Sequence, residues 1–274
     1  MQTTTQQDRQ PVIEVKNLVT HYGTRRILNN VNMTVHTGEI MVIMGGSGSG
    51  KSTLLRYLLG LHQPTSGSIK LLGHDITRMS AREMDEMRKN MGVSFQGGAL
   101  FNSMTIGENV CLPLREHTRL DENTMQIMSR MKLSVVNMAG FEDLKPAQLS
   151  GGMIKRAALA RAIIMDPKLL FFDEPSAGLD PVAAAELDDL ILRIRKALNT
   201  TIVVVTHDLD STFRIADRIT VLDQGEILMI GTVDEVRNSD NERIQSLLKR
   251  EASKVEIDAD EYLRRLTGQE SPVP

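Results

Sequence analysis

An apolar run that leads into a glycine-rich loop constrains the fold of this chain more than any other segment. Residues 40–44 read Ile-Met-Val-Ile-Met, which is typical of a strand buried on both faces. Residues 45–52 then read Gly-Gly-Ser-Gly-Ser-Gly-Lys-Ser and fit the phosphate-loop pattern G-x-x-x-x-G-K-S. A helix over residues 50–59 is expected next. Strand, loop and helix in this order are the context that a phosphate loop requires. Strands that alternate with helices along the chain predict an α/β fold with a parallel core sheet.

The glycine-rich loop supplies the groups that hold a nucleoside triphosphate with its metal. Its backbone amides would surround the β-phosphate, and the Lys51 ammonium would reach the β- and γ-phosphates. The Ser52 hydroxyl is a predicted Mg²⁺ ligand. The predicted nucleotide-binding residues here are Gly45, Gly46, Ser47, Gly48, Ser49, Gly50, Lys51, Ser52 and Thr53.

Polar residues stand where further core strands are expected to end. Asp173 and Glu174 follow the apolar residues 169–172, so Asp173 would hold the Mg²⁺ shell and Glu174 could polarise the attacking water. His207 follows the strand predicted at 201–206, and Gln96 follows a short strand at 92–95. Sites in α/β proteins gather at the carboxyl ends of strands, which favours a γ-phosphate contact for His207. For Gln96 the residue type alone leaves a structural role open.

The segment Leu149-Ser-Gly-Gly-Met153 is a second predicted anion-binding loop. Ser150 can cap a helix, and Gly151 and Gly152 let backbone N–H groups approach an anion closely. A single nucleotide site needs only one such loop. The second loop therefore makes sense if it completes a site on another molecule.

Periodicity predicts the remaining elements. Alternating strands are expected at residues 13–16 and 31–35, a further strand at 67–72, and a hairpin of 218–222 with 226–230. Capping boxes at Ser80/Glu83 and Thr105/Glu108 open two helices. The first is expected to carry Met84, Met87 and Met91 at helical spacing, and Pro113 should end the second. Longer helices are predicted at 121–133, with Met125, Met128 and Met131 on one side, at 150–165, and from Asp180 to Leu198.

Composition excludes several classes of protein. The net charge is −3, which argues against nucleic acid as a partner. Cys111 is the single cysteine, so no internal disulfide can form and a reducing compartment is expected. Residues 1–10 are polar and lack the apolar core of a signal peptide, and no run approaches the ~18 apolar residues of a membrane span. Any membrane role must therefore run through a partner.

Taken together, the motifs resemble those of the ATP-binding subunit of an ABC transporter, over about residues 12–235. The resemblance implies a P-loop NTPase with a RecA-like parallel core sheet, an antiparallel β subdomain and a helical subdomain at about 97–165. It makes Tyr22 the residue that stacks on adenine, Gln96 the Q-loop residue that also meets the metal, and Asp180 part of the D-loop. Glu174, His207 and Gln96 become the catalytic residues, with ATP and Mg²⁺ as cofactors.

The family forms a head-to-tail dimer with two ATP molecules at its interface. The resemblance implies that a second copy of the chain supplies Ser150, Gly151 and Gly152 to the γ-phosphate held by the first copy's phosphate loop. This arrangement would explain the second anion-binding loop. Hydrolysis would remove the bridge and open the dimer.

Met153 departs from the common LSGGQ pattern and narrows the resemblance. Residues 149–163, 96–101 and 113–118 are similar to ATPases paired with MCE-domain lipid transport systems, and most to the one that maintains outer-membrane lipid asymmetry. The implied substrate is phospholipid, and the implied place is the cytoplasmic face of the inner membrane. The implied partners are an integral membrane permease, an MCE-domain lipid-binding subunit and a small STAS-type subunit. Residues 100–114 would receive the permease's coupling helix, with Met104, Ile106 and Val110 lining the groove.

Other functions fit the sequence less well. A soluble ABC protein acting on DNA or ribosomes usually has two cassettes or a long coiled-coil insertion. A GTPase would need an Asn-Lys-x-Asp motif. Within transporters, the alternative is the ATPase of an importer for amino acids or other small solutes.

The two ends of the chain carry separate expectations. Residues 1–11 are predicted to be a disordered lead, and 12–240 to form the ATPase domain. Residues 241–274 would be a C-terminal extension. In that extension Ile257, Tyr262, Leu263 and Leu266 are either part of a solvated tail or an amphipathic face that docks on a neighbouring subunit.

Overall fold

The computed structural model describes residues 10–249. The chain divides into two units, Met1–Asn238 and Ser239–Pro274. In the second unit, helix α9 (Glu242–Leu248) is capped by the Asn241 side chain, which accepts from the backbone N–H groups of Arg243 and Ile244. The expected amphipathic face at 257–266 lies outside the described residues.

A six-stranded sheet forms the centre of the first unit. Its strand order is β10 (Glu226–Gly231), β9 (Arg218–Asp223), β3 (Ile40–Met44), β8 (Thr201–Thr206), β7 (Leu169–Asp173) and β6 (Met91–Ser94). Strands β9, β3, β8, β7 and β6 run parallel, and β10 pairs antiparallel with β9 as the predicted hairpin. The expected parallel core is confirmed.

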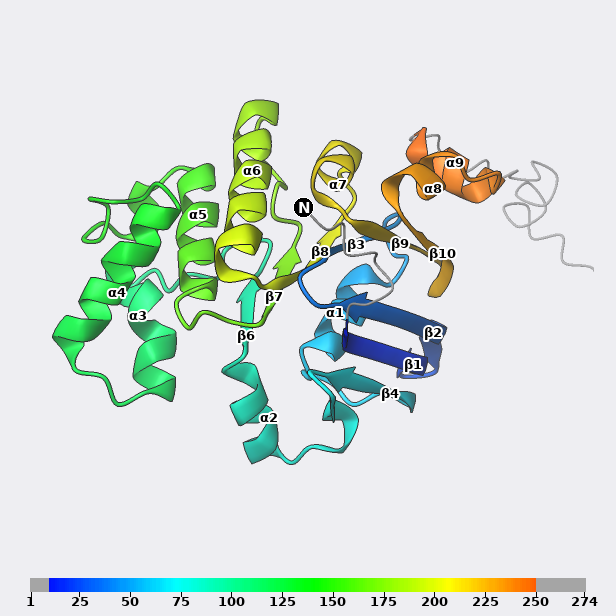
Figure 1. Ribbon diagram of the computed structural model, residues 1–274, viewed down its shortest axis with the longest axis horizontal. Coiled ribbons are helices and arrows are strands. Elements are labelled where there is room, and N and C mark those ends of the chain that lie inside the picture. Colours follow the sequence, from blue (N-terminus) through cyan, green and yellow to red (C-terminus); the bar gives the residue numbers. More distant parts are fainter. Residues whose placement is uncertain (1–9, 250–274) are drawn as a thin grey trace, which may run out of the picture. The chain divides into compact units, whose positions relative to one another are not determined.

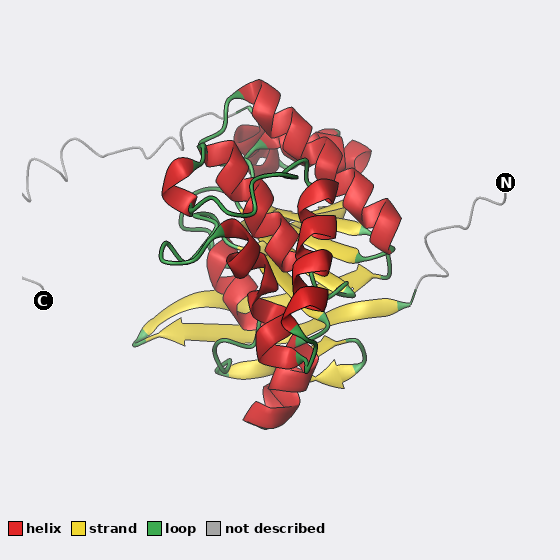
Figure 2. Cartoon of the chain, turned by 90° about the vertical axis from the view of Figure 1, so that its left-hand side faces the viewer, coloured by secondary structure: helices red, strands yellow, loops and turns green. Residues whose placement is uncertain are grey.

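The central strands β3 and β8 are buried at every residue, so both faces of the sheet are covered there. Ile40 and Val42 point into a core shared with helices, whereas Met41 and Ile43 point into a core shared with the second sheet. Most of the helical residues in the first core come from α3 (Ile106–His117), α4 (Glu122–Val135), α5 (Gly151–Ala162) and α6 (Pro181–Leu198). In Figure 1 these helices lie on one side of the strands, with α3 and α4 packed on α5; Figure 2, viewed from that side, shows helices in front of the strands.

The second sheet is antiparallel and has the order β2 (Arg25–His36), β1 (Pro11–Tyr22), β4 (Ser66–Leu71) and β5 (His74–Asp75). Helix α1 (Lys51–Leu58) packs between it and the parallel sheet (Figure 1). The alternation at residues 13–16 and 31–35 correctly predicts β1 and β2. β1 begins at Pro11, so residue 11 belongs to a strand rather than to the expected lead.

The remaining elements connect these layers. They are helix α2 (Ala81–Arg88), helix α7 (Leu209–Ile215), helix α8 (Val233–Arg237), and two 3₁₀ turns at Ile76–Arg78 and Pro146–Gln148. Met84 and Met87 are buried on α2 as expected, but Met91 is not part of that helix. It begins strand β6, because the helix ends at Arg88 and its C-terminal turn leads straight into the sheet.

Helix α3 continues through Pro113, so the prediction that this proline ends the helix is wrong. Proline removes one intrahelical hydrogen bond at a cost of about 3 kcal/mol. The helix nevertheless buries Ile106, Val110 and Leu114 completely, at the i, i+4 and i+8 positions of one face. Burial of three large aliphatic side chains, at about 1.5–3 kcal/mol each, outweighs that cost.

Burial of residues on α3 and exposure of a residue on α4 contradict two further expectations. Ile106 and Val110 have no exposed surface and cannot line a groove for a coupling helix; only Met104 of that predicted set is partly exposed. On α4, Met125 is buried but Met131 is 63% exposed, because residues six apart lie about 120° apart around a helix. Ser129 and Leu133 complete the buried face of α4.

Candidate functional site

The residues predicted to act on a nucleotide meet at the carboxyl ends of three neighbouring strands. β3, β8 and β7 are adjacent and parallel, so the loops that follow them open on the same edge of the sheet. The phosphate loop follows β3, His207 follows β8, and Asp173 and Glu174 end or follow β7. Neighbouring strands place these four features together although the sequence separates them widely.

The phosphate loop requires glycine at two positions for different reasons. At Gly45, a Cβ atom would lie 2.0 Å from the carbonyl oxygen of Leu222 on β9, so no side chain fits. At Gly50, the residue before α1, φ is +105°, a left-handed conformation that other residues avoid. The backbone therefore turns tightly between β3 and α1, with the N-terminal amides of α1 directed at the loop.

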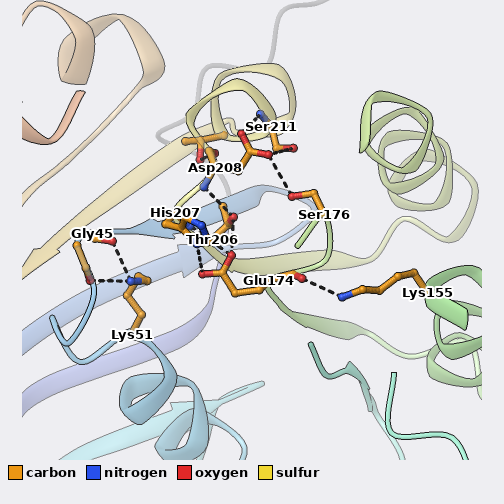
Figure 3. A network of polar contacts seen from close by, with 11 residues as sticks. Gly45, Lys51, Lys155, Glu174, Ser176, Thr206, His207, Asp208 and Ser211 are labelled. Atoms are coloured by element: carbon orange, nitrogen blue, oxygen red, sulfur yellow. Dashed lines mark hydrogen bonds and ion pairs between the residues drawn. The ribbon is translucent and has the colours of Figure 1, made fainter. Parts of the chain in front are cut away.

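Lys51 is buried at the start of α1 and turns back over the loop. Its Nζ donates to the carbonyl oxygens of Gly45 and Gly46, both at 2.8 Å (Figure 3). Burial lowers the pKa of Lys51, while the nearby carboxylates of Glu174 and Asp173 oppose that shift. The ammonium is thus held at the centre of the loop, opposite two acids.

Asp173 fits the role of a residue that organises a Mg²⁺ shell. Its Oδ1 is buried and has no hydrogen-bond partner within residues 10–249, which is unusual for a carboxylate oxygen. Burial, and next the charge of Glu174, raise the pKa of Asp173.

Ser52 is the second residue of α1, and its side chain is exposed. No group of three His, Cys, Asp or Glu side chains in the described part of the chain forms a metal site. A Mg²⁺ ion carried by phosphates and water needs only one or two protein ligands, and Ser52 with Asp173 fit that need.

Glu174 is held from two sides. Its backbone is left-handed, with φ +48°, and its N–H donates to the carbonyl of Val205 at 2.8 Å. Its carboxylate accepts from the Thr206 hydroxyl at 3.0 Å and lies 2.9 Å from Nδ1 of His207 (Figure 3). The side chain of Glu174 is nearly buried, whereas that of His207 is exposed. The pair therefore faces the open edge of the sheet.

Gln96 follows β6 and is exposed, on the far side of β7 from β8. Its main-chain carbonyl accepts a hydrogen bond from the ammonium of Lys155 on α5. The same ammonium donates to the carbonyl of Glu174 at 3.1 Å. Gln96 is thus linked through Lys155 to the end of β7.

Ser150, Gly151 and Gly152 lie apart from this cluster, at the start of α5. The Ser150 hydroxyl caps the helix by accepting from the N–H of Met153 at 3.3 Å. A Cβ on Gly151 would meet nothing within 4 Å, and one on Gly152 would make only an ordinary contact with Leu179. Packing within this chain therefore does not require either glycine. Met153 is partly buried against the helical core.

Three further predicted residues lie at the ends of β1, α6 and α1. Tyr22 ends β1 with 43% of its surface exposed, and its ring meets His62 edge-on with centroids 6.5 Å apart. Asp180 caps α6 by accepting from the N–H groups of Val182 and Ala183, both at 3.0 Å. Thr53 is buried in the first turn of α1.

Sequence reasoning missed the side chains that connect the site. The sequence predicts Thr206 only as a strand residue, and the predicted site residues do not include Lys155. A signal for Lys155 was present: it shares the buried face of α5 with Ala158, Leu159 and Ala162, at i, i+3, i+4 and i+7. A lysine on an apolar helix face indicates a buried partner. Nothing comparable marked Thr206, since threonine is common in strands.

Comparison with known proteins agrees with this arrangement. A family model described as "ABC transporter" matches residues 28–177. The chain belongs to the ABC transporter family. The ABC transporter cassette predicted from the motifs, with its fold class and its ATPase type, is confirmed.

Particular members of the family are similar over most of the chain. The Haemophilus influenzae "Intermembrane phospholipid transport system ATP-binding protein MlaF" is 43% identical over 260 residues, which cover 94% of this chain and 98% of that protein. The Mycobacterium tuberculosis "Probable ribonucleotide transport ATP-binding protein mkl" is 41% identical and covers 86% of this chain, which spans 66% of that protein.

A solved structure of an ABC cassette is also similar. The dimeric post-hydrolysis state of the cassette MJ0796, bound to ADP and Pi, has a TM-score of 0.75 at 30% identity and covers 81% of this chain and 98% of its own. Within residues 10–249, no helix of this ABC transporter cassette is both long and apolar enough to cross a membrane.

Proposed function

We propose that this chain is the ATP-hydrolysing subunit of a phospholipid transporter, acting as a head-to-tail dimer on an integral membrane permease at the cytoplasmic face of the inner membrane. Phospholipid is proposed as the substrate because of the similarity to Haemophilus influenzae MlaF, which extends over nearly the full length of both chains. The mkl protein matches almost as well by identity but over less of its own length, so ribonucleotide is the second candidate substrate.

ATP binding would use the phosphate loop as it stands. The amides of the loop and of the first turn of α1 would surround the β-phosphate, where the helix dipole favours negative charge. Lys51 would exchange its bonds to the carbonyls of Gly45 and Gly46 for bonds to phosphate oxygens. Ser52 and Asp173 would hold Mg²⁺, which neutralises charge on the β- and γ-phosphates.

Hydrolysis would depend on Glu174 and His207. Glu174 would orient a water molecule and accept its proton. His207, which is exposed beside Glu174, would contact the γ-phosphate. Thr206 keeps the carboxylate in place by donating to Oε2. Gln96 is proposed to contact the metal and the attacking water. Tyr22 is proposed to contact the adenine, and Asp180 the dimer interface.

The head-to-tail dimer is supported by the glycines of the second loop. Gly151 faces open space in this chain, so its missing side chain leaves room for something outside the chain. The γ-phosphate bound to a second copy fits this place, because the N-terminus of α5 attracts anions. Each ATP would then be held by two chains.

The remaining partners are proposed on the MlaF similarity. They are the permease, an MCE-domain lipid-binding subunit and a small STAS-type subunit. Phe101, which is 52% exposed beside the loop that carries Gln96, is a better candidate for a permease contact than the buried Ile106 and Val110.

One experiment separates the two candidate substrates. The tagged full-length chain, carrying Glu174→Gln to prolong the ATP-bound state, is purified from its native membranes with its partners. Mass spectrometry then identifies the co-purified proteins and small molecules. Phospholipid bound together with an integral membrane permease supports the proposal. A permease that carries ribonucleotide without phospholipid contradicts it.

A further inference from the structure

Helix α5 directs two cations at the loop that carries Gln96. Lys155 is buried and donates to the carbonyl of Gln96. Arg161 donates through Nη2 to the carbonyl of Gly98 and through Nη1 to that of Ala99, both at 2.7 Å. Hydrogen bonds from charged donors are stronger than neutral ones and are strongest away from water. These contacts hold residues 96–99 to α5.

The loop itself is shaped to receive these contacts. Gly98 and Ala99 both have left-handed backbones, with φ of +75° and +49°. A Cβ on Gly98 would lie 2.8 Å from Cγ2 of Ile154, so the loop backbone rests directly on the side chains of α5. Loop and helix are therefore expected to move together.

Lys155 also reaches beyond this loop. Its Nζ donates to the carbonyl of Glu174 at 3.1 Å, from the side of Glu174 opposite to His207 (Figure 3). One ammonium with three N–H donors thus joins α5, the loop of Gln96 and the end of β7. Burial lowers the pKa of Lys155, while the nearby carboxylates of Glu174 and Asp173 oppose that shift.

The same helix begins at the second anion-binding loop. Lys155 lies five residues after Ser150, which is about 7.5 Å along the helix axis. A helix of this length moves as a rigid body. Any displacement of Ser150, Gly151 and Gly152 is therefore passed to the carbonyl groups that Lys155 holds.

We propose that Lys155 is a positioning residue. It sets the positions of Glu174 and Gln96, and these positions depend on whether the Ser150-Gly151-Gly152 segment of the same chain is bound to the partner's nucleotide. The inference rests on the proposed head-to-tail ATPase. Engagement of one ATP site would then prepare the catalytic residues of the other site through α5. Hydrolysis is consequently expected to be cooperative in ATP.

The test compares Lys155→Met with Arg156→Met in the full-length chain. Arg156 is the next residue of α5 and is equally a bonded cation, but it contacts Glu186 and the carbonyl of Val136, away from the site. ATP binding, kcat, KM and the Hill coefficient are measured for each. Lys155→Met is expected to lower kcat at least about tenfold and to bring the Hill coefficient to about 1, with ATP affinity unchanged within about twofold. Lys155→Arg should restore much of the rate, and Arg156→Met should match the wild type.

Two outcomes overturn the inference. One is a Lys155→Met variant that retains both the wild-type kcat and its Hill coefficient. The other is a loss of ATP affinity and melting temperature in step with kcat, which would mean a merely structural role. If Lys155→Met does not fold, Lys155→Gln, which keeps two N–H donors but no charge, takes its place in the same comparison. A wild-type chain that hydrolyses no ATP would instead contradict the proposed function.

Discussion

The carboxylate of Glu174 lies 2.9 Å from the imidazole Nδ1 of His207, although the two residues are 33 positions apart in the sequence. The contact exists because β7 and β8 are paired in parallel, with Asp173 opposite Val205. Each residue follows directly after its strand. The acid and the imidazole are therefore placed side by side by the sheet itself, at the edge where the phosphate loop also opens.

Glu174→Gln is expected to bind ATP with normal affinity and to lower the rate of hydrolysis at least about 100-fold, because an amide cannot accept a proton from water. A closed dimer should then accumulate in the presence of ATP. Phosphate release and light scattering after gel filtration measure the two effects. Glu186→Gln, on the exposed side of α6, is the matched acid-to-amide control and should hydrolyse ATP normally. Normal turnover of Glu174→Gln would remove Glu174 from its role.

Thr206→Val removes the hydroxyl that donates to Glu174 and accepts from the N–H of Asp208 at 3.1 Å. We expect kcat to fall about tenfold and the free energy of unfolding to fall by about 1–3 kcal/mol, since the variant leaves buried groups without partners. Thr201→Val provides the control on the same strand. Thr201 is equally buried and accepts from the N–H of Gly38, far from the site. Similar losses of kcat in both variants would show that the hydroxyl of Thr206 has no specific role.

Asp188 makes stability depend on pH. It is buried on α6, accepts from Ser211 at 2.9 Å, and burial raises its pKa from 3.8 to about 6. The folded protein therefore holds this proton more tightly than the unfolded chain. The associated stability is fully present below pH 4 and is lost as the pH rises through 6.

Asp188→Asn should therefore unfold at a higher urea concentration than the wild type at pH 7, by a free energy of up to about 3 kcal/mol. The difference should shrink as the pH falls toward 4. Asp189→Asn is the neighbouring control; its carboxylate is exposed and paired with Arg214. A difference between Asp188→Asn and wild type that does not change with pH would contradict the argument.

Ser150→Arg should abolish hydrolysis while the phosphate loop of the same chain keeps its ATP affinity, because the arginine would obstruct only the partner's nucleotide. The variant also loses a helix cap, at a cost of about 1 kcal/mol. Ser80→Arg removes the cap of α2, outside the site, and controls for that cost. Phosphate release and equilibrium ATP binding are the measurements. Retained hydrolysis in Ser150→Arg would exclude the segment from catalysis.

The elements of the site that could be predicted are those with local signatures. The phosphate loop is a run of consecutive residues whose glycines are needed where they stand, and the apolar runs before Asp173 and His207 mark strands by themselves. Parallel pairing then brings the strand ends together without further information. The ATP-binding fold followed from these local features.

What could not be predicted depends on tertiary packing. Pro113 normally ends a helix, and only the burial of α3 against its neighbours overrides that preference. The exposed position of Met131 depends on the helix phase, which three methionines do not fix. The bonds of Lys155 to Gln96 and Glu174 join three segments that become neighbours only once α5 packs on the sheet.

Each ATP site is proposed to be shared between two chains, and a mixture of two defective chains tests this sharing. One chain carries Ser150→Arg and the other Lys51→Ala, both with Glu174→Gln so that ATP is retained rather than hydrolysed. In a head-to-tail dimer of the two, one site has an intact phosphate loop and an intact Ser150. Retention of labelled ATP is measured by gel filtration for the mixture and for each chain alone. Labelled ATP is expected in the dimer fraction of the mixture and in the dimer fraction of neither chain alone. A mixture whose dimer fraction holds no more labelled ATP than those of the separate chains would show that the sites are not shared.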